Sequence, residues 1–252
     1  LKNNYIIKGL VKDGVLNLLN KKRIKNIDLD FEVNNKFSNV RNLKFSYNKI
    51  KFVSQKISIT NFKNYFSIKG QIQNNFLSLS QKEIKNLINF RNDLILDNLE
   101  FSSNNDFSFK IDKKIKLKNL KFKSSLNIKN LSINHNYNLK EYLPNLKEEI
   151  NLKDHTLIFD FKENNLLVDG RGKIKIQNEL EEIEYFINKK KNDWFFETQL
   201  DLKKSPIIID FLNFEKKDES ELTLVLARNL SLLKGLKFHT PHLGTFFLQR
   251  RH

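Results

Sequence analysis

Residues 27–33 read Ile-Asp-Leu-Asp-Phe-Glu-Val, and this stretch decides the fold because apolar and polar side chains alternate along it without a break. A period of two places the apolar side chains on one face of an extended strand and the carboxylates on the other. The same alternation returns at 43–47, 107–111, 120–122, 126–128, 131–133 and 173–176. We therefore predict a mainly β protein with one apolar face and one face rich in Lys and Asn.

Strand patterns that follow one another along the chain favour a long, curved antiparallel meander sheet. The alternation leaves two outcomes open for the apolar face. The sheet either closes into a sandwich, which buries that face inside the molecule, or stays open as a taco-like β-groove whose inner surface takes an apolar ligand. Both outcomes predict the same sequence pattern.

Two stretches space their apolar residues as helices do. In 80–91 the sequence SQKEIKNLINFR begins with Ser80 and Glu83, which together read as a capping box. In 138–149 the helical spacing is started or interrupted by Pro144. We predict a short helix near 80–91 and a second near 138–149.

One six-residue motif, apolar-x-Asn-apolar-x-apolar, occurs five times, as IKNIDL (24–29), VRNLKF (40–45), LDNLEF (96–101), LKNLKF (117–122) and IKNLSI (128–133). The first apolar position has the wrong parity to share a face with the other two unless the chain adds a residue. Asn tolerates left-handed backbone angles better than most residues. We expect bulges or tight turns at Asn26, Asn42, Asn98, Asn119 and Asn130.

Glycine placement predicts further irregularities in the strands. Residues 5–14 and 166–176 each run an apolar stretch into Asp-Gly, a dipeptide that favours tight hairpin turns. The Gly-x-Gly at 170–172 lacks the third glycine and the following helix of a nucleotide-binding loop. We expect turns or bulges at Gly9, Gly14, Gly170 and Gly172.

The composition argues against catalysis. The chain has no Cys, which excludes thiolate zinc sites, cysteine nucleophiles and disulfides. Its five His form no helical metal-ligand pair, and Asp154 beside His155 has no visible catalytic partner. We interpret the acidic cluster from Glu179 to Glu184 as a solvated face. We predict no enzyme, no catalytic residues, no metal site and no cofactor.

A net charge of +16, from 45 Lys and Arg against 29 Asp and Glu, raises the question of nucleic acid. Lys dominates over Arg and is spread along the polar face instead of being clustered. The runs at 21–23 and 189–191 fall where turns are expected, and Phe and Tyr take apolar-phase positions. We expect no specific nucleic acid partner, and basic nucleic-acid binding is the third hypothesis.

The chain resembles the AsmA-like superfamily of bacterial envelope proteins, and within it the large members related to TamB and YhdP. The resemblance is carried by YIIKGLVKDG (5–14), the repeated strand openings IKNIDL and VRNLKF, LLVDGRGKIKI (166–176) and residues 193–224. It covers most of 1–226 and rests on strand patterns and glycine positions. It implies a repeating β-groove, anchored in the inner membrane, that conducts phospholipid through the periplasm toward the outer membrane.

Under this resemblance, 1–226 is one β-groove section, with no stretch apolar enough for a spanning helix. With no Met in the chain, we interpret it as a fragment whose anchor lies outside it. The expected partners are phospholipid acyl chains, and the expected location is the periplasmic face of the inner membrane. The positions that would line the groove are Leu43, Phe45, Leu99, Phe101, Leu120, Phe122, Leu131 and Ile133.

The alternative hypothesis is a β-rich structural or adhesion domain of the cell envelope that carries no ligand. The last residues, 227–252, differ from the rest, because they hold three of the five His and three of the seven Arg. We interpret this segment as a linker, a truncated domain edge or an out-of-frame stretch. We expect no ordered pairing there.

Overall fold

The computed structural model describes residues 5–17, 23–87, 94–136, 140, 143–210, 213–217, 222–231 and 245–250. Within these ranges the only α-helix is α1 (Gln81–Leu87). The strands are β1 (Ile6–Asn17), β2 (Arg23–Asn34), β3 (Phe37–Tyr47), β4 (Ile50–Asn61), β5 (Tyr65–Leu79), β6 (Leu94–Asp112), β7 (Leu117–His135), β8 (Glu149–Lys162), β9 (Asn165–Lys175), β10 (Leu180–Lys190), β11 (Asp193–Leu202), β12 (Ile207–Ile209), β13 (Phe214–Lys216), β14 (Leu222–Ser231) and β15 (Thr245–Arg250).

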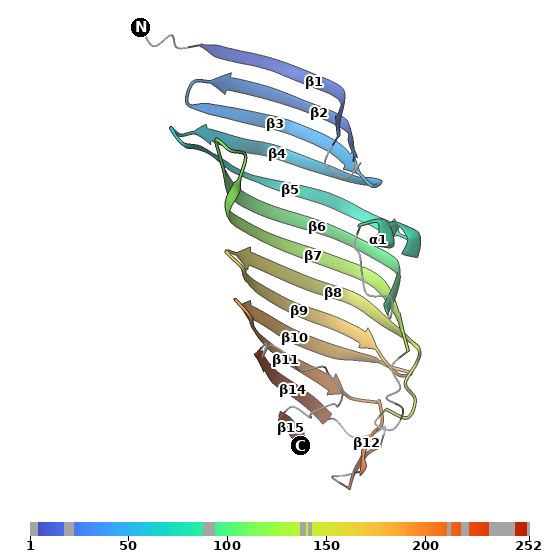
Figure 1. Cartoon of the computed structure of the whole chain (residues 1–252). Helices are drawn as coiled ribbons and strands as arrows, with labels where there is room; N and C mark the ends of the chain where they lie inside the picture. Colours follow the sequence, from blue (N-terminus) through green and yellow to red (C-terminus); the bar gives the residue numbers. More distant parts are fainter. Residues whose placement is uncertain are drawn as a thin grey trace. The chain divides into compact units, whose positions relative to one another are not determined.

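The strands form a meander, as the alternating pattern predicted (Figure 1). One 13-stranded sheet runs in the order β1 to β11, then β14 and β15, and β12 pairs with β13 in a separate two-stranded sheet. The strand order is open, beginning at β1 and ending at β15. The prediction of a mainly β, antiparallel meander with a short helix is therefore confirmed.

The chain divides into two compact units. Unit 1 consists of Leu1–Leu77, Ser102–Leu126 and Asp160–Glu163. Unit 2 consists of Ser78–Phe101, Asn127–Phe159 and Asn164–His252. The sequence predicted one section over 1–226 and gave no sign of this division.

The asparagines of the repeated motif mark irregular positions in the strands. Asn26, Asn42 and Asn98 have φ of 52°, and Asn119 has φ of 53°. The β2–β3 register shifts twice. The first shift lies between Lys25 and Asp28, where Asn26 is located, and the second lies between Asp28 and Asp30, opposite Asn42 on β3. The added residue lets the apolar positions before and after the Asn share a face.

Asn130 departs from this pattern, so the expected left-handed position is wrong there. The residue is absent from the described residues with positive φ. Its amide nitrogen instead donates a hydrogen bond to the Glu100 carboxylate on β6, at 3.3 Å. Asn130 therefore contacts the neighbouring strand through its side chain and does not occupy a left-handed bulge position.

Of the four glycine predictions, the one at Gly14 is confirmed as a bulge, and those at Gly9, Gly170 and Gly172 are wrong. Gly14 lies within β1 beside a register shift, so the Asp-Gly pair makes a bulge and not a hairpin turn. Gly170 and Gly172 sit in the unbroken β9–β10 ladder, where they pair with Tyr185 and Ile183. They form neither a turn nor a bulge. Gly9 pairs regularly with Phe31.

Steric crowding explains three of these glycines. A Cβ on Gly9 would lie 2.5 Å from the Phe31 ring, and one on Gly170 would lie 2.2 Å from the Tyr185 ring. A Cβ on Gly172 would lie 2.5 Å from the His155 ring. Each glycine gives an aromatic side chain of the neighbouring strand room to lie across the backbone.

Of the two predicted helices, the first is present. Glu83 accepts hydrogen bonds at 2.9 Å from both the backbone N–H and the hydroxyl of Ser80. Residues 88–91 of the predicted span lie outside the described residues. Helix α1 thus begins directly after the predicted capping residue.

The predicted helix over 138–149 is wrong where the structure describes it. Residues 143–148 hold a turn at Pro144 and Asn145 and no helix, and β8 begins at Glu149. Asn145 N–H donates to Gln177 Oε1 at 3.1 Å and Lys147 N–H donates to the Ile176 carbonyl at 3.0 Å. These backbone groups therefore bond to residues far along the chain and not to the preceding helical turn. Residues 138, 139, 141 and 142 lie outside the described residues.

Strand pairing also extends into the C-terminal segment, where we expected none. β14 pairs with β11 as far as Ser231, and β15 pairs with β14 over Thr245–Arg250. Ladder hydrogen bonds are made by the backbone, so the unusual composition of this segment does not prevent them. Residues 232–244, 251 and 252 lie outside the described residues.

Unit 2 has a hydrophobic core, and part of it comes from a second layer. Ile207 and Ile209 of β12 are buried against the apolar face of the main sheet. The other buried members of this cluster are Ile174, Leu200, Leu202 and Leu222. The β12–β13 pair therefore covers this part of the apolar face.

Candidate functional site

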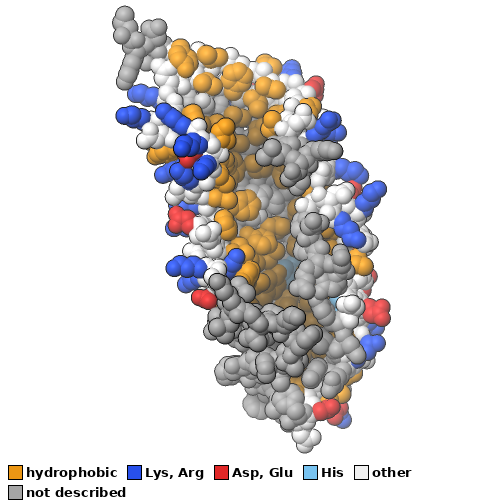
Figure 2. All heavy atoms as spheres, in the orientation of Figure 1, with side chains coloured by type: hydrophobic (Ala, Val, Ile, Leu, Met, Phe, Trp, Pro, Cys, Tyr) orange, Lys and Arg blue, Asp and Glu red, His pale blue; other side chains and the backbone are white. Residues whose placement is uncertain are grey.

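The apolar face of unit 1 is built by the strand register. Phe45 pairs with Phe52 and Leu43 pairs with Ser54 across β3 and β4, so these side chains share one face. The Phe45 and Phe52 rings stack with centroids 5.2 Å apart. Figure 2 shows hydrophobic side chains gathered over the strands of unit 1, with Lys and Arg toward the strand ends.

This face has little cover within the described residues. Among the described residues, Ile50 is the only buried hydrophobic residue of unit 1, and the other buried hydrophobic residues belong to unit 2. Large apolar side chains remain exposed to solvent on this face of unit 1, with Leu117 at 55% and Phe122 at 36% exposure. A single sheet layer with one uncovered apolar face is the state that the open-groove outcome predicts.

The eight predicted groove-lining residues are divided between the two units. Leu43, Phe45, Leu120 and Phe122 lie in unit 1, and all four are partly or largely accessible. Leu99, Phe101, Leu131 and Ile133 lie in unit 2. Phe101 and Leu131 are buried there, at 8% and 9% exposure. Leu99 and Ile133 are partly accessible, as Leu43, Phe45 and Leu120 are, so Phe101 and Leu131 are the two predicted lining residues that a ligand does not reach directly.

A belt of hydrogen-bonded polar side chains crosses the apolar face of unit 1. Ser124 donates to Asn105 Oδ1 at 2.7 Å, and Asn105 Nδ2 donates to Ser103 Oγ at 2.8 Å. Ser103 in turn donates to Asn74 Oδ1. Three strands, β5, β6 and β7, are thus joined through side chains. The polar groups of the belt bond mostly to one another. They therefore do not need water or a polar ligand on this face, and the face can still bind an apolar ligand.

Sequence reasoning missed this belt, although a signal was present. Ser103, Asn105 and Ser124 occupy apolar-phase positions of otherwise alternating strands. Ser54 on β4 does the same, and its buried hydroxyl has no hydrogen-bond partner within the described part of the chain. Polar residues that repeat in the apolar phase of successive strands are the pattern to look for.

In unit 2, His155 and Tyr185 form a buried polar pair. The imidazole Nε2 lies 3.1 Å from the Tyr185 hydroxyl, and the two rings stack with centroids 5.4 Å apart. Burial lowers the pKa of His155. Burial, followed by the charge of Asp169, raises the pKa of Tyr185 to about 12. Both groups are therefore neutral at physiological pH.

In unit 2, a buried carboxylate binds the loop that precedes β12. Glu181 is 2% exposed, and it accepts hydrogen bonds at 2.9–3.1 Å from the backbone N–H groups of Lys203, Lys204 and Ser205. The ammonium of Lys216 donates to the Ser205 carbonyl at 2.9 Å. These bonds hold the loop before β12 against β10, and they explain two buried charges as structural groups.

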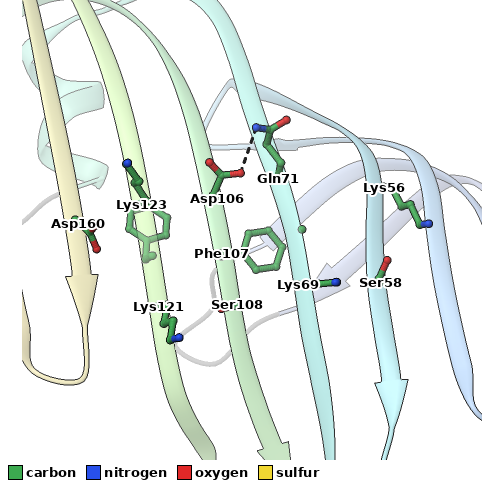
Figure 3. A pocket seen from close by; sticks show the side chains of 12 residues that line it. Lys56, Ser58, Lys69, Gln71, Asp106, Phe107, Ser108, Lys121, Lys123 and Asp160 are labelled. Atoms are coloured by element: carbon green, nitrogen blue, oxygen red, sulfur yellow. Dashed lines mark hydrogen bonds between the residues drawn. The ribbon is translucent and has the colours of Figure 1, made fainter.

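The polar face of unit 1 carries a shallow hollow of about 650 Å³ (Figure 3). Four lysines from β4, β5 and β7 surround it, together with two aspartates: Lys56, Lys69, Lys121, Lys123, Asp106 and Asp160. Gln71 donates a hydrogen bond to Asp106 at 3.2 Å. No ion pair involves the four lysines within the described residues, so the hollow presents unneutralised positive charge.

Neither metal-binding clusters nor spanning helices are found in the described part of the chain. It contains no group of three or more His, Cys, Asp or Glu side chains placed to hold a metal ion. No helix there has the length and hydrophobicity to cross a membrane.

Comparison of the chain with known proteins gives no match to any family model, curated protein or solved structure.

Proposed function

We propose that this chain is a non-enzymatic section of an AsmA-like envelope protein and that the apolar face of unit 1 binds phospholipid acyl chains. The observation that carries the proposal is the lack of a covering layer over that face in the described residues, where Ile50 alone is fully buried. A sealed sandwich would have buried a row of such side chains, as the β12–β13 layer does in unit 2.

Hydrophobic burial supplies the binding energy in this proposal. Each acyl methylene removed from water contributes about 0.8 kcal/mol, and the exposed Leu117 and Phe122 offer the apolar surface. Lys121 and Lys123 alternate with Phe122 and keep the opposite face of β7 in water. The full proposal places the section at the periplasmic face of the inner membrane, anchored by a segment outside it, where it conducts phospholipid toward the outer membrane.

The test is lipid extraction of the purified chain followed by mass spectrometry. We expect phospholipid to co-purify, and we expect Leu117→Gln/Phe122→Gln to lower the lipid-to-protein ratio by about tenfold or more. The matched control, Lys121→Gln/Lys123→Gln, changes the same strand on its other face and leaves the ratio unchanged. A wild-type chain that carries no lipid would contradict the proposal and favour a ligand-free structural or adhesion domain.

A second candidate function is binding of an anionic polymer such as nucleic acid by the polar face of unit 1. The hollow ringed by Lys56, Lys69, Lys121 and Lys123 favours it. Such binding weakens steeply with salt because counterions are released from the polymer. A gel shift with arbitrary DNA that disappears in Lys69→Gln/Lys121→Gln/Lys123→Gln would support this function, and no shift at low salt would exclude it.

A further inference from the structure

Three turns of unit 1 lie side by side at one end of its strands: 34–37 between β2 and β3, 61–66 between β4 and β5, and 112–117 between β6 and β7 (Figure 1). The Asn61 N–H donates to the Lys36 carbonyl at 2.8 Å, which joins the first two turns. The three turns together are called the turn edge below.

A cation–π contact joins the second and third turns. The Lys110 ammonium, close to the end of β6, lies 4.7 Å from the centroid of the Tyr65 ring. Tyr65 in turn stacks on Phe62 at 4.7 Å across its own turn. The turn edge is therefore one connected surface and not three separate loops.

The turn edge exposes large apolar side chains in its turns, where polar residues are the rule, and at the strand ends beside them. Ile115 is 84% exposed, Leu117 55% and Phe62 45%. Phe66 and Phe37 are exposed by 42% and 37%. The β3–β4 turn at the opposite end of the strands differs, because its apolar residue Ile50 is buried at 4% exposure.

Ile115 has a backbone conformation that is unfavourable for a β-branched residue. Ile115 has φ of 60°, and it is the only apolar residue with a left-handed φ in the described ranges. Its N–H donates to the Asp112 carbonyl at 2.9 Å, and Asp112 N–H donates to the Lys116 carbonyl at 3.1 Å. This three-residue hairpin loop ordinarily places Gly or Asn at the left-handed position, and a β-branched residue there is strained. Strain retained at an exposed tip indicates a use for the side chain.

Positive charge surrounds these apolar tips. Lys113, Lys114 and Lys116 flank Ile115, and none of them has an ion-pair partner among the described residues. The one acid of this loop, Asp112, is engaged by Lys118 Nζ at 2.9 Å and by the N–H groups of Lys114 and Lys116. The carboxylate of Asp112 is therefore already paired, and the ammonium groups of Lys113, Lys114 and Lys116 can bind an external anion.

We infer that the turn edge docks on the surface of an anionic lipid bilayer, with Ile115 and Phe62 entering the interface and the lysines contacting lipid headgroups. Apolar and aromatic side chains set among lysines are the combination that interfacial binding requires. A second copy of the chain fits less well, because its own lysines would face these. This inference goes beyond acyl-chain binding by the apolar face and does not depend on it.

The test is co-sedimentation of the full chain with vesicles of equimolar phosphatidylcholine and phosphatidylglycerol, compared with pure phosphatidylcholine. We expect binding to the mixed vesicles only, weakened by added salt. Lys113→Gln/Lys114→Gln/Lys116→Gln should weaken binding about 100-fold, since each lysine near such a surface contributes about fivefold. Ile115→Asn should weaken it about tenfold and leave the thermal midpoint equal or higher, since Asn prefers this backbone angle.

Two controls separate docking from net charge and from the proposed function. Lys25→Gln/Lys44→Gln/Lys51→Gln removes the same charge from the polar face of the same unit, away from the hollow, and Leu180→Asn removes an apolar side chain that is 44% exposed in unit 2. Neither should change vesicle binding by more than about twofold. Equal losses in both lysine triples, or no binding to mixed vesicles, would overturn the inference. Ile115→Asn should keep its co-purified lipid, so failure here and failure of acyl-chain binding are distinguishable.

Because the chain has no Cys, a single engineered cysteine gives a direct readout. Phe62→Cys labelled with an environment-sensitive dye should shift to shorter wavelength on mixed vesicles, and Leu180→Cys with the same dye should not. A protein partner or a second copy on this surface would shift the dye without vesicles, in proportion to protein concentration, and that result would contradict bilayer docking.

Discussion

At the scale of single residues, the missing side chain of Gly172 allows β8 and β9 to pack closely at His155. An added Cβ would lie 2.6 Å from the Cα of His155, a backbone atom that does not move aside. Gly9 is a different case, because its added Cβ would meet the far end of the Phe31 ring on the edge strand pair. The same methyl group is therefore expected to have different effects at the two positions.

We predict that Gly172→Ala lowers the free energy of unfolding by about 1–3 kcal/mol, the usual cost of overpacking. Gly9→Ala should cost clearly less, because the Phe31 ring can rotate away. Urea denaturation of both variants measures the difference. Equal losses would show that crowding at His155 does not explain the glycine.

The His155–Tyr185 pair predicts a pH dependence of stability. Because burial lowers the pKa of folded His155, the stabilisation is full above the unfolded pKa of 6.5 and is lost as the pH falls toward the lower folded-state pKa. For Tyr185 the folded pKa is raised, so its contribution is full below the unfolded pKa of 10.0 and is lost as the pH rises through about 12. Both shifts favour the neutral pair.

The expected result is a wild-type unfolding free energy that falls between about pH 8 and about pH 5 more steeply than that of His155→Gln, which cannot titrate there. Urea titrations across this pH range measure both slopes. Parallel slopes in the two proteins would rule out His155 as the source of the pH dependence.

At the scale of strands, the Asn bulges keep apolar residues on one face. Asn42 has φ of 52°, and its amide donates to Asp30 on β2 at 2.7 Å. Asn42→Val and Asn42→Gly both remove this hydrogen bond, but only Val opposes the left-handed backbone. We predict that Asn42→Val is about 1–2 kcal/mol less stable than Asn42→Gly. Chemical denaturation provides the comparison, and a Val variant as stable as the Gly variant would be inconsistent with a left-handed bulge.

The loop between β11 and β12 depends on a single carboxylate. Glu181→Ala would leave the N–H groups of Lys203, Lys204 and Ser205 without their acceptor, at a cost on the order of 3 kcal/mol. We predict that the β12–β13 cover loosens and that binding of a hydrophobic dye increases. Glu181→Gln keeps one acceptor oxygen, so its dye binding should lie between that of the wild type and that of Glu181→Ala. Unchanged dye binding in Glu181→Ala would mean that the cover is held by apolar packing alone.

Local patterns predicted the strands, because alternation such as 27–33 is complete within one strand. The irregular Asn positions were also readable, since the parity error lies inside the six-residue motif. Features that depend on partners far along the chain were missed. Asn145 and Lys147 bond to Gln177 and Ile176, so the helix expected over 138–149 does not form there. The polar belt likewise needs three strands to be brought together.

At the scale of the whole molecule, the two units handle the apolar face differently. In unit 2 the β12–β13 pair covers it, and Leu202 and Ile207 become almost completely buried at 1% and 3% exposure. In unit 1 the described residues provide no comparable layer, and its apolar side chains other than Ile50 stay at least partly accessible. Sequence patterning predicted one face of this kind and did not distinguish the covered part from the uncovered part, because both have the same alternation.

The most direct test of acyl-chain binding is photo-crosslinking with a phospholipid that carries a diazirine on its acyl chain, followed by peptide mapping. We expect crosslinks to apolar-face residues of unit 1, such as Phe45, Leu120 and Phe122, and we expect excess unlabelled phospholipid to suppress them. Crosslinks confined to polar-face residues such as Lys44 and Lys121, or labelling that unlabelled lipid does not reduce, would contradict acyl-chain binding.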